Sequence, residues 1–144
     1  MENRHTITIQ ASLGVTQREA QVWGEASWWP KNSLMKFERE CPGPLKVGTR
    51  YRQKVLLPCA PSWDVEITVL DNARITRKFL NGMFEGSETV SCTPEPRGVK
   101  VTYVMQARIR GILNKILWPL VFKRLHDKNI EAILAHLKRY MESV

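Results

Sequence analysis

The most constraining feature of this sequence is a series of six short strand-like segments, each separated from the next by a few turn-forming residues. The breaks contain the strings CPGP, PCAPS, DN, NG and PEPRG, in which Pro, Gly, Asn and Asp are strong turn signals. Short connections of this kind favour an antiparallel meander. The expected strands are residues 34–41, 49–57, 63–70, 74–80, 83–93 and 99–108.

Shorter elements are expected before this series. Residues 5–11 alternate polar and apolar side chains, which predicts a strand. Residues 15–26 have the pattern of a short helix, in which Thr16 is the expected N-cap and Glu19 completes a capping-box spacing. Residues 27–33 contain two tryptophans and a proline, and they predict a turn or a second short helix.

A long amphipathic helix is predicted after the strands, over residues 112–140. Pro119 removes one of its hydrogen bonds and predicts a bend. The longest unbroken apolar run, residues 116–122, is far shorter than the ~20 residues that a membrane-spanning helix needs. One stripe of this helix should face the sheet. Its members are Ile112, Ile116, Pro119, His126, Ile130, Ile133, Leu134, Leu137 and Met141, with Phe122 and Tyr140 at its edge.

The order of strand, two short helices, six strands and one long helix predicts an α+β fold. A curved antiparallel sheet of about seven strands should wrap on the C-terminal helix. The chain has 144 residues and no internal repeat or linker-like tract. We therefore expect a single domain over residues 1–144.

The hairpin at the NG sequence, residues 81–82, predicts two charges on the inner face of the sheet. A two-residue loop there pairs Phe79 with Phe84, and this aromatic pair marks the inward face. Arg77 and Glu88 then lie on that face as diagonal neighbours, whereas a slip of one residue would turn both outward. Unpaired charges inside would cost several kcal/mol. The two should therefore form a structural salt bridge or the polar end of a ligand pocket.

The first half of the final helix carries more apolar surface than the sheet can cover. Leu113, Leu117 and Leu120 lie well off the inward stripe, among basic neighbours such as Lys115 and Arg124. Three explanations remain open for these leucines. They could pack on the short N-terminal helices or on a dimer partner, form the rim of an apolar cavity, or contact a membrane surface.

Charge and motifs limit the function classes. The net charge is +8, but no nucleic-acid-binding motif accompanies it, so no nucleic-acid partner is expected. Cys41, Cys59 and Cys92 are odd in number and lack zinc-ligand spacing, which argues against a disulfide framework and a metal site. No nucleotide, cofactor or hydrolase motif is present, and the first ten residues have no apolar signal-peptide core. A cytoplasmic protein without cofactor or metal is expected.

The order and spacing of the elements resemble the helix-grip fold of the START-like (SRPBCC) superfamily. The similarity runs from about Thr6 to Tyr140 and rests on VWGEASWWP, GPLKVGTRY, WDVEITVLD, FEGSETVSCTPEPRGVKVTY and RLHDKNIEAILAHLKRYM. Members of this superfamily include polyketide cyclases/aromatases, lipid-transfer START domains and coenzyme Q-binding proteins. The resemblance implies that the long helix lies across the mouth of the sheet and encloses a deep apolar cavity.

The resemblance also makes each inward-facing side chain a candidate wall of that cavity. His126 and Glu88 are candidate catalytic residues, because either could act as an acid or a base, and either could instead be a structural group. The expected ligand-binding residues are Trp28, Trp63, Arg77, Phe79, Phe84, Glu88, Tyr103, Met105, Ile116, Phe122 and His126.

The favoured function is the binding and transport of a hydrophobic small molecule, such as a lipid, an isoprenoid or a polyketide. The alternative is an enzyme of the polyketide cyclase, aromatase or dehydrase type, in which ordered binding of a flexible chain does most of the work. A second alternative is an interaction module. Such a module would bind a protein partner, including a second copy in a homodimer, or make transient contact with a membrane surface.

Overall fold

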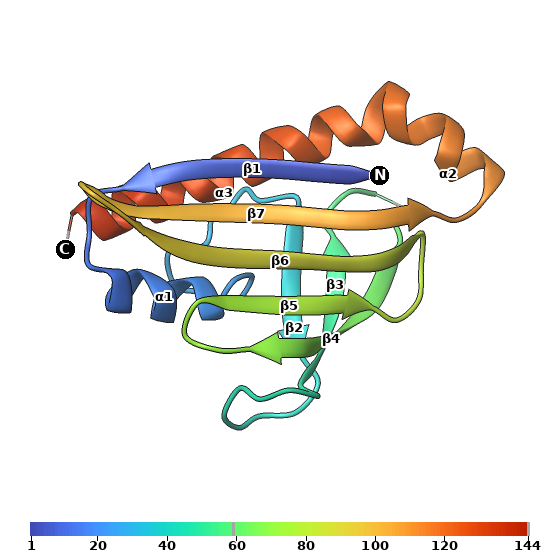
Figure 1. Ribbon diagram of the computed structural model, residues 1–144. Coiled ribbons are helices and arrows are strands. Elements are labelled where there is room, and N and C mark those ends of the chain that lie inside the picture. The colour runs from blue at the N-terminus through green and yellow to red at the C-terminus, as the bar shows by residue number, and fades with distance from the viewer. Residues whose placement is uncertain (59, 144) are drawn as a thin grey trace.

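The computed structural model describes residues 1–58 and 60–143. Its elements form a seven-stranded antiparallel sheet, one short helix after the first strand and a long C-terminal helix in three sections (Figure 1). In chain order they are β1 (Glu2–Ile9), α1 (Leu13–Gln21), β2 (Met35–Arg39), β3 (Arg50–Val55), β4 (Ser62–Leu70), β5 (Arg74–Phe79), β6 (Phe84–Glu95), β7 (Gly98–Ile109), α2 (Ile112–Leu117), η1 (Trp118–Phe122) and α3 (Lys123–Glu142). The predicted α+β class is confirmed.

The sheet is the predicted meander closed by the first strand. Its order is β1-β7-β6-β5-β4-β3-β2, so β1 pairs with the last strand and β2 forms the other edge. Figure 1 shows β2 and β3 running across the direction of β5, β6 and β7, which curls the sheet into a half-barrel. The long helix α3 lies alongside β1 and covers the mouth of the curled sheet. None of the helices in the described part of the chain is long and apolar enough to cross a membrane.

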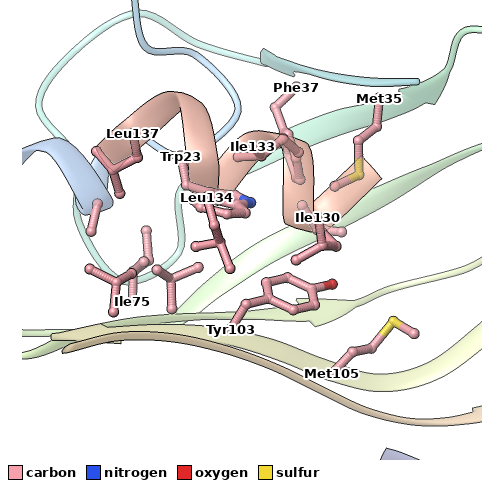
Figure 2. Packing of buried hydrophobic residues seen from close by; sticks show 14 of the residues in the cluster. Trp23, Met35, Phe37, Ile75, Tyr103, Met105, Ile130, Ile133, Leu134 and Leu137 are labelled. Carbon is pink, nitrogen blue, oxygen red and sulfur yellow. The ribbon is translucent and has the colours of Figure 1, made fainter. Parts of the chain in front are cut away.

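The core fills the concave side of the sheet. Alternate residues of β7 point inward, and α3 buries its apolar stripe against them. Figure 2 shows Tyr103 and Met105 on the sheet facing Ile130 and Leu134 of the helix. The buried members of the predicted stripe are Ile130, Ile133, Leu134, Leu137 and Met141. Each such side chain contributes roughly 1.5–3 kcal/mol by leaving water, which holds α3 on the sheet.

The β5–β6 hairpin has a longer loop than predicted. The predicted two-residue loop, which pairs Phe79 with Phe84, would also pair Arg77 with Gly86. Arg77 instead pairs with Glu88, so the predicted register is wrong by two residues. The cause lies in Asn81, whose side chain accepts a hydrogen bond from the backbone N–H of Asp64 and donates one to the Asp64 carboxylate, both at 2.8 Å. These bonds tie the loop to β4. Because side chains alternate with a period of two, the faces are unchanged, and Arg77 and Glu88 point inward directly opposite each other.

The predicted capping box is wrong, because α1 begins earlier than expected. Thr16 lies inside the helix, and its hydroxyl donates to the carbonyl oxygen of Ser12 at 2.8 Å. Glu19 accepts a hydrogen bond from the indole nitrogen of Trp28 at 2.8 Å, rather than bonding back to the helix start. Thr16 therefore bonds within the first turn of α1, whereas Glu19 fastens the helix to the turns that follow it.

The second short helix that was offered as an alternative to a turn is not formed. Residues 22–34 make a series of turns. Gly24 has a φ of 89°, in the left-handed region, and a Cβ there would overlap an aromatic ring of β2. The turns gather Trp23, Trp28 and Trp29, with ring centroids 6.3 Å and 5.2 Å from Trp23. Packing of these three rings replaces the helical pattern.

The final helix changes direction where Pro119 predicts, through the π-helical turn η1. A π turn takes one more residue than an α turn, so it displaces the inward positions that precede it. Ile112 and Ile116 are consequently 80% and 53% exposed, whereas Trp118 is buried. The prediction that Ile112, Ile116 and Pro119 face the sheet is wrong, although the stripe after the π turn is confirmed.

Candidate functional site

A cavity of about 290 Å³ lies between the inner face of the sheet and the final helix. This volume is at the lower end of the range for small-molecule pockets. Its walls are mostly apolar. The aromatic and thioether side chains that line it are Met35, Trp63, Phe79, Met83, Phe84, Tyr103, Met105, Trp118 and Phe122.

The loop after β3 forms one rim of this cavity. Leu57 and Pro58 line the cavity and are also exposed, so the cavity reaches the surface beside them. The helix supplies the facing rim through Asn114, Phe122 and Leu125, which are half-buried. An apolar molecule can therefore enter between the loop and the helix.

A buried ion pair supports the sheet side of the cavity. The nearest charged atoms of Arg77 and Glu88 are 3.9 Å apart, and the two side chains are at most 3% exposed. The guanidinium of Arg77 packs over two aromatic rings that are edge-to-face with each other, 4.7 Å from the centroid of Phe37 and 4.6 Å from that of Tyr51. It also donates to the carbonyl oxygen of Trp23 at 2.7 Å. These contacts hold the cation behind the wall of the cavity.

Of the two residues in the ion pair, Glu88 lines the cavity and Arg77 does not. One of its carboxylate oxygens, Oε2, accepts a hydrogen bond from the hydroxyl of Tyr103 at 2.9 Å. The other oxygen, Oε1, is buried and has no hydrogen-bond partner among the described residues. Burial raises the pKa of Glu88, and this effect is opposed by the charge of Arg77 and by the Tyr103 hydrogen bond. The carboxyl group is therefore easier to protonate than an ordinary glutamate.

The helix side of the cavity adds two more buried polar atoms. Nε2 of His126 and Nε1 of Trp118 have no hydrogen-bond partner within the described part of the chain. The imidazole lies between two rings, with centroid distances of 5.8 Å to Tyr103 and 5.7 Å to Trp118. Burial lowers the pKa of His126 to about 4. The imidazole is therefore neutral at pH 7, and its Nε2 can donate or accept according to the tautomer.

A second polar cluster joins α3 to β1 beside the cavity. Oδ1 of Asp127 accepts a hydrogen bond from Asn3 at 2.7 Å and lies 2.9 Å from Nε2 of His5, and Oδ2 accepts from Lys123 at 2.7 Å. Burial acts to raise the pKa of Asp127, but its three partners outweigh this effect and lower the pKa to about 2. Across residues 1–58 and 60–143, no group of three His, Cys, Asp or Glu side chains could hold a metal ion. The cluster is an anchor for α3.

Most of the predicted ligand-binding residues line this cavity. They are Trp63, Phe79, Phe84, Glu88, Tyr103, Met105, Phe122 and His126. Arg77 lies behind the wall, and Trp28 packs against the other tryptophans of residues 22–34. Ile116 points to solvent.

The sequence-based prediction missed four residues of the cavity that carry polar groups, which are Gln53, Asn114, Trp118 and Asn129. Gln53 accepts a hydrogen bond from the indole of Trp63 at 3.0 Å. Gln53 lies two residues after Tyr51 on β3, so the period of two places both side chains on the same, buried face of the strand. This spacing is a signal that could have placed Gln53 inward. Trp118 had no comparable signal, because its inward direction depends on the π turn.

No protein-family model matches the sequence, and no curated protein sequence matches it. Among solved structures, TTHA0849 from Thermus thermophilus is similar at a TM-score of 0.76 and 20% identity, covering 99% of this chain and 98% of that one. The Aha1 dimer from Colwellia psychrerythraea is similar at 0.68 and 14%, covering 99% and 96%. The di-domain ARO/CYC StfQ from the steffimycin biosynthetic pathway is similar at 0.71 and 14%, covering 99% of this chain and 50% of StfQ. These similarities show that the chain has the SRPBCC-type helix-grip fold.

Proposed function

We propose that this helix-grip protein binds a hydrophobic small molecule that carries an uncharged polar group. The observation that carries the proposal is an apolar cavity lined by three residues that each bury a polar atom without a hydrogen-bond partner among the described residues. These atoms are Oε1 of Glu88, which is 3.9 Å from its ion-pair partner Arg77, Nε1 of Trp118 and Nε2 of His126. A buried polar atom without a partner costs about 1–3 kcal/mol. A ligand that bonds these atoms would remove that penalty in addition to burying its apolar surface.

The chemistry of the cavity favours a compact and neutral ligand. The carboxyl oxygen of Glu88 accepts hydrogen bonds and would repel a ligand carboxylate, while the indole N–H of Trp118 only donates. A molecule with a hydroxyl and a carbonyl group would suit both. A volume of about 290 Å³ favours a polyketide-derived ring system or a short isoprenoid over a lipid with two long chains. Transport would consist of carrying such a molecule through water.

Probe binding tests the proposal. The uncharged fluorophore N-phenyl-1-naphthylamine should bind the protein and brighten, and native mass spectrometry of the purified protein should detect a retained apolar molecule. Leu125→Trp fills part of the cavity, because Leu125 is a half-buried wall residue. Its affinity for the probe should fall at least about tenfold, which corresponds to about 1.4 kcal/mol.

Val47→Trp is the matched control, because Val47 is 60% exposed in the loop between β2 and β3. It should bind the probe as the unaltered protein does, and both variants should keep the melting temperature. Equal affinity in Leu125→Trp and Val47→Trp would show that the probe binds elsewhere. Absence of both probe binding and a retained molecule would refute the proposal.

Catalysis in the same cavity is a second candidate function. Glu88 has a raised pKa and could donate a proton, and neutral His126 could accept one. StfQ, a structural neighbour of this chain, is an ARO/CYC protein. If the chain is a cyclase, aromatase or dehydrase, mass spectrometry should show conversion of a short poly-β-ketothioester. His126→Ala and Glu88→Gln should then each abolish conversion without unfolding the protein, whereas conversion unchanged in both variants would exclude these roles.

The proposed location is the cytoplasm, and it rests on the thiols. Cys41 is exposed and Cys92 is buried, and both are free. Burial raises the pKa of Cys92 to about 11, so this thiol is unreactive. Cys59 lies outside the described residues. An exposed free thiol such as Cys41 suits a reducing compartment. Thiol labelling of the protein in freshly lysed cells would test the location.

A further inference from the structure

The outer side of the α2–η1 segment exposes a continuous apolar surface. Five of its side chains are between 45% and 80% exposed; they are Ile112, Leu113, Ile116, Leu120 and Val121, here called the outer face. The spacing of four residues between Ile112, Ile116 and Leu120 places these three along one side of the helical segment. Contiguous apolar surface of this kind marks an interaction site on a water-exposed protein.

The same segment is also apolar on its inner side. Trp118 and Phe122 line the cavity, together with Asn114. These positions are offset by two residues from Ile116 and Leu120, which is about half a helical turn. A helical segment that is apolar on opposite sides is normally buried on both. Here only the inner side has a partner within the described chain, so the outer face requires an occupant from outside it.

Unpaired cations surround the outer face. Arg108, Lys115, Arg124 and Lys128 are exposed and form no ion pair with the described residues. Arg124 follows Leu120 by four residues and so continues the outer face at its C-terminal end. The acidic residue of this stretch, Asp127, is already occupied by the cluster that anchors α3. Glu85, which lies opposite Arg108 across the β6–β7 pair, is already paired with Arg110 at 3.7 Å. The four cations therefore leave an excess of positive charge around the outer face.

This charge distribution discriminates between possible occupants. In a symmetric dimer built on the outer face, the same cations would face one another, and like charges in contact are destabilising. An anionic membrane surface supplies the complementary charge, with about 1 kcal/mol for each Lys or Arg near the lipid headgroups. An apolar helix face with basic neighbours also has the composition of helices that lie in the plane of the interface.

We propose that the outer face docks on an anionic lipid surface, with the α2–η1 segment lying in the plane of the membrane interface. Leu113 and Leu120 reach the acyl boundary, while Lys115 and Arg124 contact anionic headgroups. The segment stays at the surface because it is too short to span a bilayer. The docking does not depend on a ligand in the cavity, so it is independent of the proposed function.

Vesicle co-sedimentation tests the docking. The protein should sediment with vesicles of two parts phosphatidylcholine to one part phosphatidylglycerol, and not with phosphatidylcholine alone. Added salt should weaken the binding, because it screens the attraction between the cations and the headgroups. Leu113→Ser combined with Leu120→Ser should reduce the affinity at least about tenfold. Replacing either Lys115 or Arg124 with alanine should reduce it by about fivefold.

Val47→Ser is the matched control, because it removes an exposed apolar side chain from a loop elsewhere and should leave binding unchanged. All replaced side chains are exposed, so circular dichroism and the melting temperature should not change. Equal sedimentation of the Leu113→Ser/Leu120→Ser variant and the unaltered protein would overturn the proposal. Absence of vesicle binding would overturn it as well. In that case, if sedimentation velocity shows a dimer that the two substitutions convert to monomer, the outer face binds a second copy of the chain.

Discussion

Replacing Arg77 with methionine tests how the protein keeps a charged pair in its core. The substitution removes a 2.7 Å hydrogen bond to Trp23, the contacts with two aromatic rings, and the cation that lies 3.9 Å from Glu88. Both members of the pair are almost fully buried. Loss of one partner from a buried ion pair typically lowers the free energy of unfolding by about 3–5 kcal/mol, and we expect a loss of that size at pH 7.

Much of this loss should depend on pH. Burial raises the pKa of Glu88, and Arg77 lowers it. Without Arg77, the pKa in the folded state rises further above the ordinary value of 4.5 that the unfolded chain retains. The folded variant then keeps a proton that the unfolded chain has released, so its stability is lost as the pH rises. The free energy of unfolding should fall by up to about 1.4 kcal/mol per pH unit, or about 2.7 kcal/mol between pH 5 and pH 7.

Urea unfolding followed by tryptophan fluorescence at pH 5, 6 and 7 measures this dependence. Arg77→Met/Glu88→Gln is the control, because it carries the same loss of packing without the titrating carboxyl group. The gap in stability between the double variant and Arg77→Met should widen as the pH rises. A gap that stays constant over this range would refute the reasoning, since the loss would then come from packing alone.

Two further predictions concern the final helix. Lowering the pH from 8 to 5 should reduce stability by about 2 kcal/mol through His126, because burial lowers its pKa to about 4 while the unfolded chain takes up a proton near pH 6.5. In thermal unfolding, the decrease in stability between pH 8 and pH 5 should be smaller in His126→Phe than in the unaltered protein. It should be unchanged in His136→Gln, the control at another histidine of α3. Ile133→Ala empties a fully buried position and should cost about 2–5 kcal/mol. The same change at Ile116, which is 53% exposed, should alter stability by less than about 0.5 kcal/mol, and equal losses in urea unfolding would contradict the outward direction of Ile116.

Alternation along the strands was enough to identify the inner face of the sheet. Arg77 and Glu88 point inward as predicted, although the hairpin register was wrong by two residues. The error was harmless to the faces because side-chain direction has a period of two. The register itself depends on Asn81, which bonds to a residue 17 positions away along the chain. A contact at that separation leaves no local pattern.

The cavity was predictable where its walls come from regular strands. Tyr103, Met105 and Glu88 line it because each occupies an inward position of β6 or β7. The wall contributed by the helix was predicted correctly only at Phe122 and His126, and Trp118 was missed. Its position depends on the π turn, whose extra residue rotates everything before it relative to α3.

Turn chemistry and the periods of strand and helix were therefore enough to predict the strands, the long helix, the antiparallel order and the direction of most side chains. The tertiary structure decided the register of the hairpin, the turns around the three tryptophans and the rotation of the first part of the final helix. It also decided which polar atoms the cavity residues bury, three of which have no hydrogen-bond partner within residues 1–58 and 60–143. The hairpin register and the placement of Trp23 involve contacts between residues far apart in the chain, such as Asp64 with Asn81 and Trp23 with Tyr103. Packing of large side chains there outweighs local preference.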